Sequence, residues 1–239
     1  MKTLVLQHIA CEPPGVFEDV LIERGAAITR VELDEGGRLP DWRDFDLIVA
    51  MGGPMSVNDE SEHPWLVAEK RLIREAVQAG VGYWGACLGV QLLASSLGAR
   101  VYAGPQPEVG VLAVTLTDEG ASDSVFAGLP RELATLQWHG DTFDLPEGAV
   151  LLAESPAYPH QAFRYGRAAY GVQFHVEVTG DMAREWATVP AYVRSLEQTL
   201  GAGAAPGLFD EFDRAAAGMQ LVARQMFERW LDVAVATPR

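Results

Sequence analysis

A cysteine stands between two glycines in the stretch Gly85-Ala86-Cys87-Leu88-Gly89, which has the spacing of a nucleophile elbow. In such an elbow a strand turns so tightly into a helix that larger flanking side chains would collide. A thiol at a helix N-terminus faces unpaired backbone N–H groups and the helix dipole, which lower its pKa and favour the thiolate. The pattern predicts that Cys87 is a nucleophile and that the N–H of Leu88 donates to an oxyanion. A buried, inert cysteine beside a tight turn is the alternative.

A base for that thiol is offered by GVQFHVEV (171–178), where Gln173, His175 and Glu177 alternate with apolar residues. If this segment is a strand, alternate side chains share a face and the three polar groups lie together. Glu177 can accept a hydrogen bond from the imidazole of His175, fix its tautomer and stabilise the imidazolium. A solvated strand face is the alternative, but the presence of Cys87 favours a catalytic pair.

A glycine pair in Met51-Gly52-Gly53-Pro54 closes the apolar run DLIVAMGG (46–53). Glycines allow a backbone N–H to approach a ligand closely. Open parallel sheets bind their ligands at the carboxyl ends of the strands. This segment is therefore expected to supply a second oxyanion donor, with a plain turn as the alternative.

The elements that must position these groups alternate between strand and helix patterns. Strands are predicted at 3–9, 26–33, 46–53 and 81–84, and helices at 16–24, 63–80 and 87–98. This rhythm indicates βαβ units and an α/β fold, with an open, mostly parallel sheet and helices on both faces.

Past residue 100 the pattern changes to short strands separated by turn residues. They are predicted as added antiparallel strands at 108–118, 133–140, 149–155, 161–166 and 168–178. Thr179 is a good N-cap for a following helix, and Pro190 starts or interrupts another. An amphipathic helix is predicted at 211–236, with Phe212, Met219, Val222, Met226 and Trp230 near one stripe.

The composition excludes several classes of partner. The formal net charge is −15, which argues against binding to nucleic acid or to anionic membranes. No apolar run approaches the roughly 18 residues of a membrane-spanning helix, and the N-terminus does not read as a signal peptide. Two cysteines, Cys11 and Cys87, do not make a disulfide framework, so a cytoplasmic location is expected.

Four segments, in this order, resemble the motifs of the class I glutamine amidotransferase family, which uses a Cys-His-Glu triad. They are MGGPMSVND (51–59), GACLGVQLLA (85–94), WHGD (138–141) and YGVQFHVEVT (170–179). The chain looks like the stand-alone subgroup that resembles the amidotransferase domain of GMP synthase. The resemblance implies a flavodoxin-like amidotransferase domain over 1–180, no cofactor and no metal. The remainder, 181–239, is expected to be a helical extension packed on the same domain.

Carried onto this sequence, the resemblance implies that Cys87 attacks the side-chain amide of glutamine, while His175 shuttles protons and Glu177 orients it. A γ-glutamyl thioester, glutamate and ammonia would result. The N–H groups of Gly53 and Leu88 would stabilise the tetrahedral oxyanion. Substrate contacts are implied for Gln91, His139, Gly140 and Asp141.

The motifs leave the exact reaction open. Ammonia can pass to a synthase partner or another acceptor enzyme, or the chain can be a γ-glutamyl peptidase that needs no partner. A non-catalytic regulatory module on the same fold is a third interpretation. A metal site built from Cys87, His139, His175 and Glu177 lacks a closely spaced ligand pair. Homo-oligomer formation also stays open.

Overall fold

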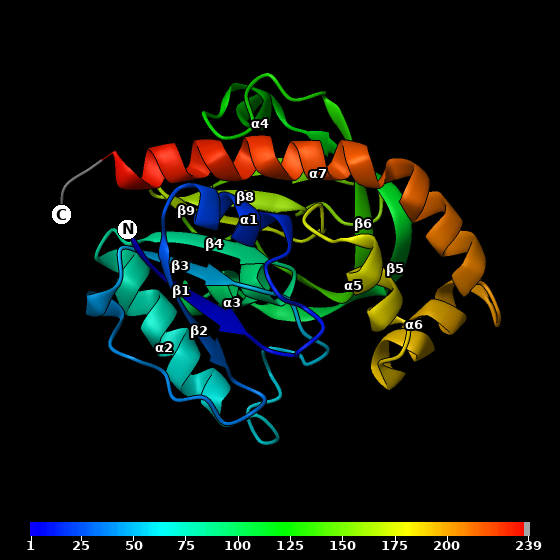
Figure 1. Cartoon of the computed structure of the whole chain (residues 1–239), viewed down its shortest axis with the longest axis horizontal. Coiled ribbons are helices and arrows are strands. Elements are labelled where there is room, and N and C mark those ends of the chain that lie inside the picture. Colours follow the sequence, from blue (N-terminus) through cyan, green and yellow to red (C-terminus); the bar gives the residue numbers. More distant parts are fainter. Residues whose placement is uncertain (237–239) are drawn as a thin grey trace.

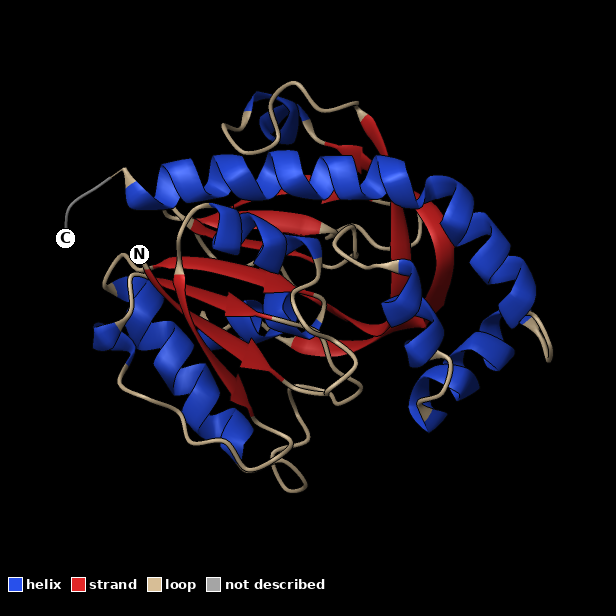
Figure 2. Cartoon of the chain, in the orientation of Figure 1, coloured by secondary structure: helices blue, strands red, loops and turns tan. Residues whose placement is uncertain are grey.

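The computed structural model describes residues 1–236, and its centre is one nine-stranded sheet with helices on both faces (Figures 1 and 2). The strands are β1 (Lys2–Gln7), β2 (Ala27–Glu32), β3 (Leu47–Ala50), β4 (Gly82–Ala86), β5 (Val101–Leu116), β6 (Glu132–Phe143), β7 (Ala149–Glu154), β8 (Ala162–Tyr165) and β9 (Ala169–Val172). The helices are α1 (Val16–Glu23), α2 (Trp65–Gln78), α3 (Leu88–Ser96), α4 (Asp118–Ser122), α5 (Gly180–Trp186), α6 (Pro190–Leu200) and α7 (Ala205–Val235), with a 3-10 turn at Trp42–Asp44.

The sheet order is β2-β1-β3-β4-β9-β8-β7-β5-β6, and it joins a parallel half to an antiparallel half. The first five strands pair in parallel. From β9 onward the pairings are antiparallel. The predicted α/β architecture with added antiparallel strands is therefore confirmed, although the sheet is mixed rather than purely parallel.

One strand behaves differently from its prediction. The segment 168–178 was expected to be an added antiparallel strand, but β9 pairs in parallel with β4 and antiparallel only with β8. It is therefore the junction between the two halves of the sheet. The strand also ends at Val172, well before the predicted end.

Two apolar cores lie on opposite faces of the sheet. One contains buried residues of α1, α5, α6 and α7, and the other contains buried residues of α2 and α3. The central strands β3 and β4 are buried along their whole length, as expected for strands covered on both faces. Figure 1 shows α7 running across the molecule beside α1.

Two of the three C-terminal helices begin where the sequence predicts. Thr179 caps α5 by accepting a hydrogen bond from the N–H of Met182 (3.4 Å), and Pro190 is the first residue of α6. The long helix α7 begins at Ala205, earlier than the predicted 211. Of its predicted stripe, Phe212, Met219, Met226 and Trp230 are buried, whereas Val222 is half-buried. Within residues 1–236, no helix is both long and apolar enough to cross a membrane.

Candidate active site

Cys87 lies at the turn from β4 into α3, and its backbone is strained. Its φ of 52° and ψ of −106° make it the one non-glycine residue with positive φ among residues 1–236. Such a conformation persists only where the surroundings enforce it, and it is concentrated at functional sites. The N–H of Cys87 donates to the carbonyl oxygen of Val172 (2.9 Å), which ties the turn to the end of β9.

Close packing explains the two glycines beside this cysteine. A Cβ on Gly85 would lie 2.5 Å from the carbonyl oxygen of Gly89. A Cβ on Gly89 would lie 2.1 Å from the carbonyl oxygen of Ala50 in β3. Both distances are far inside van der Waals contact, so α3 can approach the sheet here only through glycine.

The structure brings Cys87, His175 and Glu177 together. The Nδ1 atom of His175 lies 2.6 Å from Oε1 of Glu177, and the imidazole also interacts with the thiol of Cys87. The other carboxylate oxygen of Glu177 accepts from the N–H of Val176 (3.0 Å). Because Nδ1 faces the carboxylate, Nε2 is left for the thiol. All three side chains are buried.

His175 and Glu177 do not lie on a regular strand, contrary to the prediction. After β9 the chain continues irregularly, held by one antiparallel bridge between His175 and Leu136 of β6. The expected alternation nevertheless survives. Phe174 and Val176 point into the apolar core, while Gln173 reaches the site with its amide nitrogen 3.6 Å from the sulfur of Cys87.

Burial is the largest single influence on the pKa values of Cys87 and His175. Burial raises the pKa of the Cys87 thiol, and the hydrogen bond and charge of His175 only partly oppose it. The predicted lowering of that pKa is therefore wrong. Burial by itself would lower the pKa of His175, but the charge of Glu177 and hydrogen bonds with Cys87 and Glu177 hold it well above its ordinary value. Cys87 and His175 thus influence each other's pKa.

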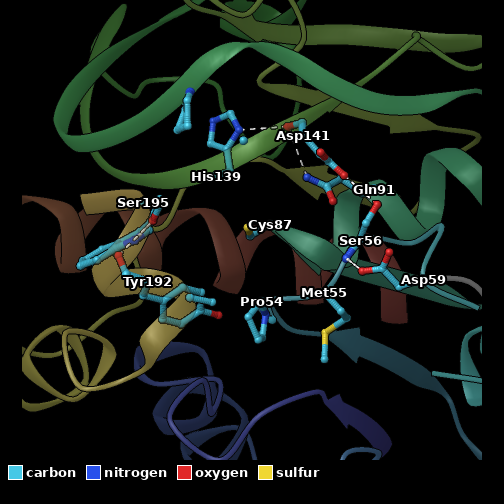
Figure 3. Close-up of a pocket in the computed structure, with 15 residues that line it drawn as sticks. Pro54, Met55, Ser56, Asp59, Cys87, Gln91, His139, Asp141, Tyr192 and Ser195 are labelled. Atoms are coloured by element: carbon cyan, nitrogen blue, oxygen red, sulfur yellow. Dashed lines mark hydrogen bonds between the residues drawn. The ribbon is translucent and has the colours of Figure 1, made fainter. Parts of the chain in front are cut away.

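A cavity of about 320 Å³ opens beside the sulfur of Cys87, near the lower end of the range for ligand pockets (Figure 3). Its lining includes five of the residues expected in the site, namely Gly53, Gln91, His139, Gly140 and Asp141. The amide of Gln91 donates to Gln173 (3.0 Å), whose own amide nitrogen lies next to the sulfur of Cys87.

Two backbone N–H groups beside Cys87 are free to meet a ligand. Within residues 1–236, neither Gly53 nor Leu88 donates its N–H to a protein acceptor. Gly53 borders the cavity, and Leu88 is the first residue of α3, where helical N–H groups lack internal partners.

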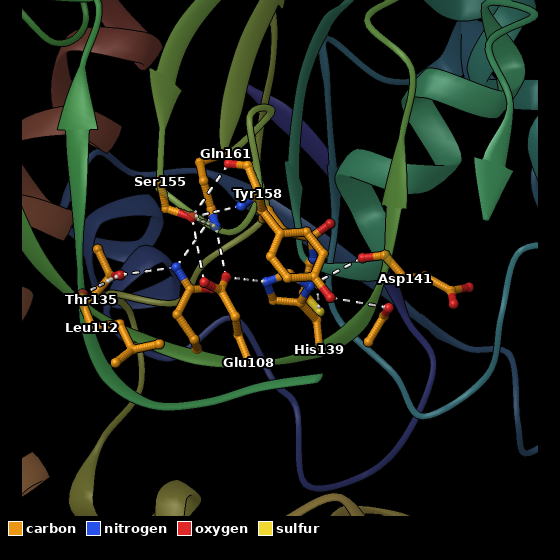
Figure 4. Close-up of polar contacts among 12 residues, drawn as sticks. Glu108, Leu112, Thr135, His139, Asp141, Ser155, Tyr158 and Gln161 are labelled. Atoms are coloured by element: carbon orange, nitrogen blue, oxygen red, sulfur yellow. Dashed lines mark hydrogen bonds and ion pairs between the residues drawn. The ribbon is translucent and has the colours of Figure 1, made fainter. Parts of the chain in front are cut away.

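His139 forms part of the cavity wall and is held on both ring nitrogens. Its Nδ1–H donates to the carbonyl oxygen of Asp141 (3.0 Å), and its Nε2 lies 3.2 Å from Glu108 (Figure 4). Glu108 also accepts from the amide of Gln161 (2.9 Å). This buried network fixes the wall contributed by β5 and β6. Across the described part of the chain, no cluster of three His, Cys, Asp or Glu residues could hold a metal ion.

The C-terminal helices supply site residues that sequence reasoning missed. Ala191, Tyr192 and Ser195 of α6 line the cavity. The ring of Trp186 in α5 packs edge-on against His175, with centroids 4.7 Å apart. These residues lie outside the four motifs, and the only sequence signal was the presence of aromatic residues soon after the base.

A second missed residue is Glu12, a buried carboxyl group beside the triad. Its Oε1 accepts a short hydrogen bond from the hydroxyl of Tyr192. A Cβ on Gly52 would lie 1.9 Å from Glu12 Oε2 and 3.3 Å from Cε1 of His175, so Glu12 occupies space next to both. Burial raises the pKa of Glu12, against the opposing charge of His175. In the sequence, Glu12 begins the stretch EPPG (12–15), and nothing in that stretch signals this role.

Comparison with known proteins places the chain in a family. The model of the glutamine amidotransferase class-I family matches residues 17–185. The glutamine amidotransferase-like protein YfeJ of Salmonella typhimurium is 36% identical over 183 residues, which are 75% of this chain and 77% of that protein. The chain belongs to the class I glutamine amidotransferase family.

Two further relatives differ in how much of their own length matches this chain. The crystal structure of a glutamine amidotransferase from Thermotoga maritima matches with a TM-score of 0.86 at 32% identity, over 97% of this chain and 98% of that one. The GMP synthase [glutamine-hydrolyzing] of Lactococcus lactis subsp. cremoris is 36% identical over 166 residues, or 69% of this chain but 28% of the synthase. The chain thus spans about a quarter of the GMP synthases that it matches, whereas the match to the Thermotoga protein extends over α5 to α7.

Proposed function

We propose that this chain hydrolyses the γ-amide of a glutamine or γ-glutamyl substrate through a thioester on Cys87. One observation carries the proposal. A strained elbow cysteine lies beside a His175–Glu177 pair that interacts with its thiol, at the edge of a cavity. Nucleophile, base and orienting carboxylate in this order are the components of covalent acyl transfer.

The proposed reaction begins when His175 takes the proton of Cys87 and the sulfur attacks the amide carbon. The oxyanion is stabilised by the N–H groups of Gly53 and Leu88. His175 then returns the proton to the leaving nitrogen, and ammonia or an amine departs, leaving the γ-glutamyl thioester. Water, deprotonated by His175, attacks the thioester and releases glutamate, while Glu177 holds the imidazole in one tautomer throughout.

The cavity has two chemically different ends, with Cys87 between them (Figure 3). One end carries Gln91 and the carboxylates of Asp59 and Asp141, which suit the α-ammonium group of a γ-glutamyl moiety. The opposite end carries Tyr192 and other residues of α6. This second end supports the other candidate, a γ-glutamyl amide or peptide whose leaving group is larger than ammonia.

Further proposals concern the partners of the chain and its organisation. The relationship to GMP synthases supports transfer of ammonia to a separate synthase, because this chain matches only a fraction of their length. We further propose that 1–180 and the extension 181–239 act as one amidotransferase unit, because α5 and α6 contact the site. A cytoplasmic location and a homo-oligomer stay predictions.

The test measures glutamate release from glutamine and from a γ-glutamyl dipeptide, with and without a synthase. We expect turnover of at least one substrate by the unaltered chain and none by Cys87→Ala. Cys11→Ala is the matched control, since burial raises the pKa of that thiol to about 12 and it lies outside the cavity. Full turnover by Cys87→Ala, or no turnover of either substrate, would show the proposed function to be wrong and favour a non-catalytic module.

A further inference from the structure

A second buried histidine–glutamate pair lies beneath the oxyanion segment and has no part in the reaction described above. His8 follows β1, and its Nε2 lies 2.9 Å from Oε1 of Glu69 in α2. Neither side chain is exposed to solvent. The other ring nitrogen, Nδ1, lies 3.2 Å from the carbonyl oxygen of Gly52.

Both ring nitrogens of His8 face acceptors, so the imidazole donates in both directions. Burial alone would lower the pKa of His8, but the charge and hydrogen bond of Glu69 outweigh it and raise this pKa. The ring also stacks on Trp65, with centroids 5.6 Å apart and planes 24° apart. The donor at Nδ1 is therefore held in one place.

The carbonyl oxygen of Gly52 belongs to the same peptide group as the N–H of Gly53. Peptide bonds are planar, and residues 1–236 contain no cis bond, so this C=O and this N–H point in opposite directions. A hydrogen bond that draws the Gly52 oxygen toward His8 turns the Gly53 N–H away from His8. Gly53 borders the cavity beside Cys87, and its N–H has no protein acceptor within residues 1–236.

Two adjacent glycines make this peptide group easy to rotate, because neither carries a Cβ to restrict it. A local hydrogen bond is thus needed to hold one orientation. The pair is also incomplete as a stabilising ion pair, since Oε2 of Glu69 is buried without a partner. Buried ion pairs with unmet hydrogen bonds are poor contributors to stability, which favours a role in orientation.

We propose that His8, held by Glu69, is a positioning residue that fixes the Gly52–Gly53 peptide with the Gly53 N–H directed at the oxyanion. This inference rests on the proposed function. It adds an explanation of what orients the Gly53 N–H, the second oxyanion donor. His8 is not among the residues that line the cavity, and it acts through Gly53.

The experiment compares His8→Leu with His8→Asn by steady-state kinetics on the substrate that the unaltered chain turns over. Leucine removes the donor, whereas the asparagine amide nitrogen occupies the position of Nδ1 and can still donate to Gly52. Loss of one oxyanion donor lowers kcat by about 10²–10³-fold. We expect that fall for His8→Leu with KM changed less than about threefold, and recovery of at least about tenfold in His8→Asn.

A second measurement separates positioning from misfolding. Alkylation of Cys87 by iodoacetamide forms no oxyanion, so its rate should be the same in His8→Leu as in the unaltered chain. His160→Leu is the matched control, because His160 also donates to a carbonyl oxygen, that of Phe143 (2.6 Å), but lies outside the cavity. It should keep its kcat.

Three outcomes overturn the inference. The first is an unchanged kcat in His8→Leu. The second is equal loss of turnover and of alkylation in His8→Leu, which indicates a general structural role. The third is an asparagine variant no better than the leucine variant. Absence of turnover in the unaltered chain would instead refute the proposed function, and the role of His8 with it.

Discussion

Two buried histidine–glutamate pairs flank the oxyanion segment, and they differ in what the second ring nitrogen meets. His175 and Glu177 are 2.6 Å apart, and His8 and Glu69 are 2.9 Å apart. Beyond its carboxylate, His175 meets the thiol of Cys87, whereas His8 meets a carbonyl oxygen. A thiol can give up a proton and a carbonyl cannot. The same pair is therefore suited to proton transfer in one place and to holding a peptide group in the other.

A third histidine–glutamate pair resembles that of His8, because its second ring nitrogen also meets a carbonyl oxygen. His139 lies 3.2 Å from Glu108 and donates to the carbonyl oxygen of Asp141. This comparison teaches that a buried histidine–carboxylate pair does not by itself mark a base. The third group that the imidazole contacts decides between acid–base chemistry and positioning.

The largest expected effect comes from breaking the pair that faces sulfur. Replacing His175 with Gln should lower kcat by about 10⁴-fold or more, because the general base and acid are both lost. It should also slow alkylation of Cys87, since no group remains to accept the thiol proton. Steady-state kinetics and timed iodoacetamide labelling measure the two effects. Labelling at the unaltered rate would show that His175 does not activate the thiol.

Replacing Glu177 should lower kcat more than replacing Glu69, just as replacing His175 should lower it more than replacing His8. Glu177→Gln should lower kcat by about 10³–10⁴-fold, because the amide no longer fixes the tautomer or stabilises the imidazolium. Glu69→Gln should lower kcat by about tenfold. The glutamine carbonyl can still accept a hydrogen bond from His8, but it holds the Nδ1 donor of His8 less firmly. Kinetics of both variants side by side provide the test. Equal losses would erase the distinction between the two pairs.

The pH dependence of kcat/KM should reflect the His175–Glu177 pair beside the sulfur of Cys87 and not the His8–Glu69 pair. The reactive form of Cys87 and His175 carries one proton fewer than the fully protonated form. Because the pKa values of both groups are raised, that proton is lost at a higher pH than in an ordinary cysteine–histidine pair. We expect kcat/KM to increase with pH, with an inflection above about 6.5, the ordinary histidine value.

Removing a nearby negative charge should move this inflection to lower pH. Glu177→Gln removes the charge that raises the pKa of His175, and Glu12→Gln removes a charge that adds to the raised pKa of Cys87. Profiles of kcat/KM, or of the alkylation rate, would show the shift. Glu69→Gln is the control and should leave the inflection in place, so a comparable shift there would contradict the assignment.

The smallest effect is expected at the contact between α6 and the site. Tyr192→Phe removes the hydroxyl that donates to Glu12 and leaves a buried carboxyl oxygen without that partner. The free energy of unfolding should fall by about 1–3 kcal/mol, with kcat changed only a few-fold. Urea denaturation measures the change. Tyr102→Phe, which loses an exposed hydrogen bond to Asp144, should cost less, and equal costs would refute the importance of the buried contact.

Local patterns predicted several residues that meet at the site but not the residues that surround them. The glycines around Cys87 and the alternation of Gln173, His175 and Glu177 concern residues a few positions apart, where spacing restricts geometry directly. The parallel half of the sheet was equally predictable, because strand and helix periodicities repeat along the chain. The position of β9 was not, since strand partners are chosen by long-range pairing.

The sequence by itself determined the α/β class, the elbow at Cys87 and the His175–Glu177 pair, because each depends on patterns within short stretches of the chain. Only the tertiary structure decided the rest. His8 and Glu69 are 61 positions apart, and Tyr192 and Glu12 are 180 apart, so the fold alone brings them together. Burial likewise reversed the expected pKa shift of Cys87. The cost of removing a charge from water depends on everything packed around it, which no short stretch of sequence contains.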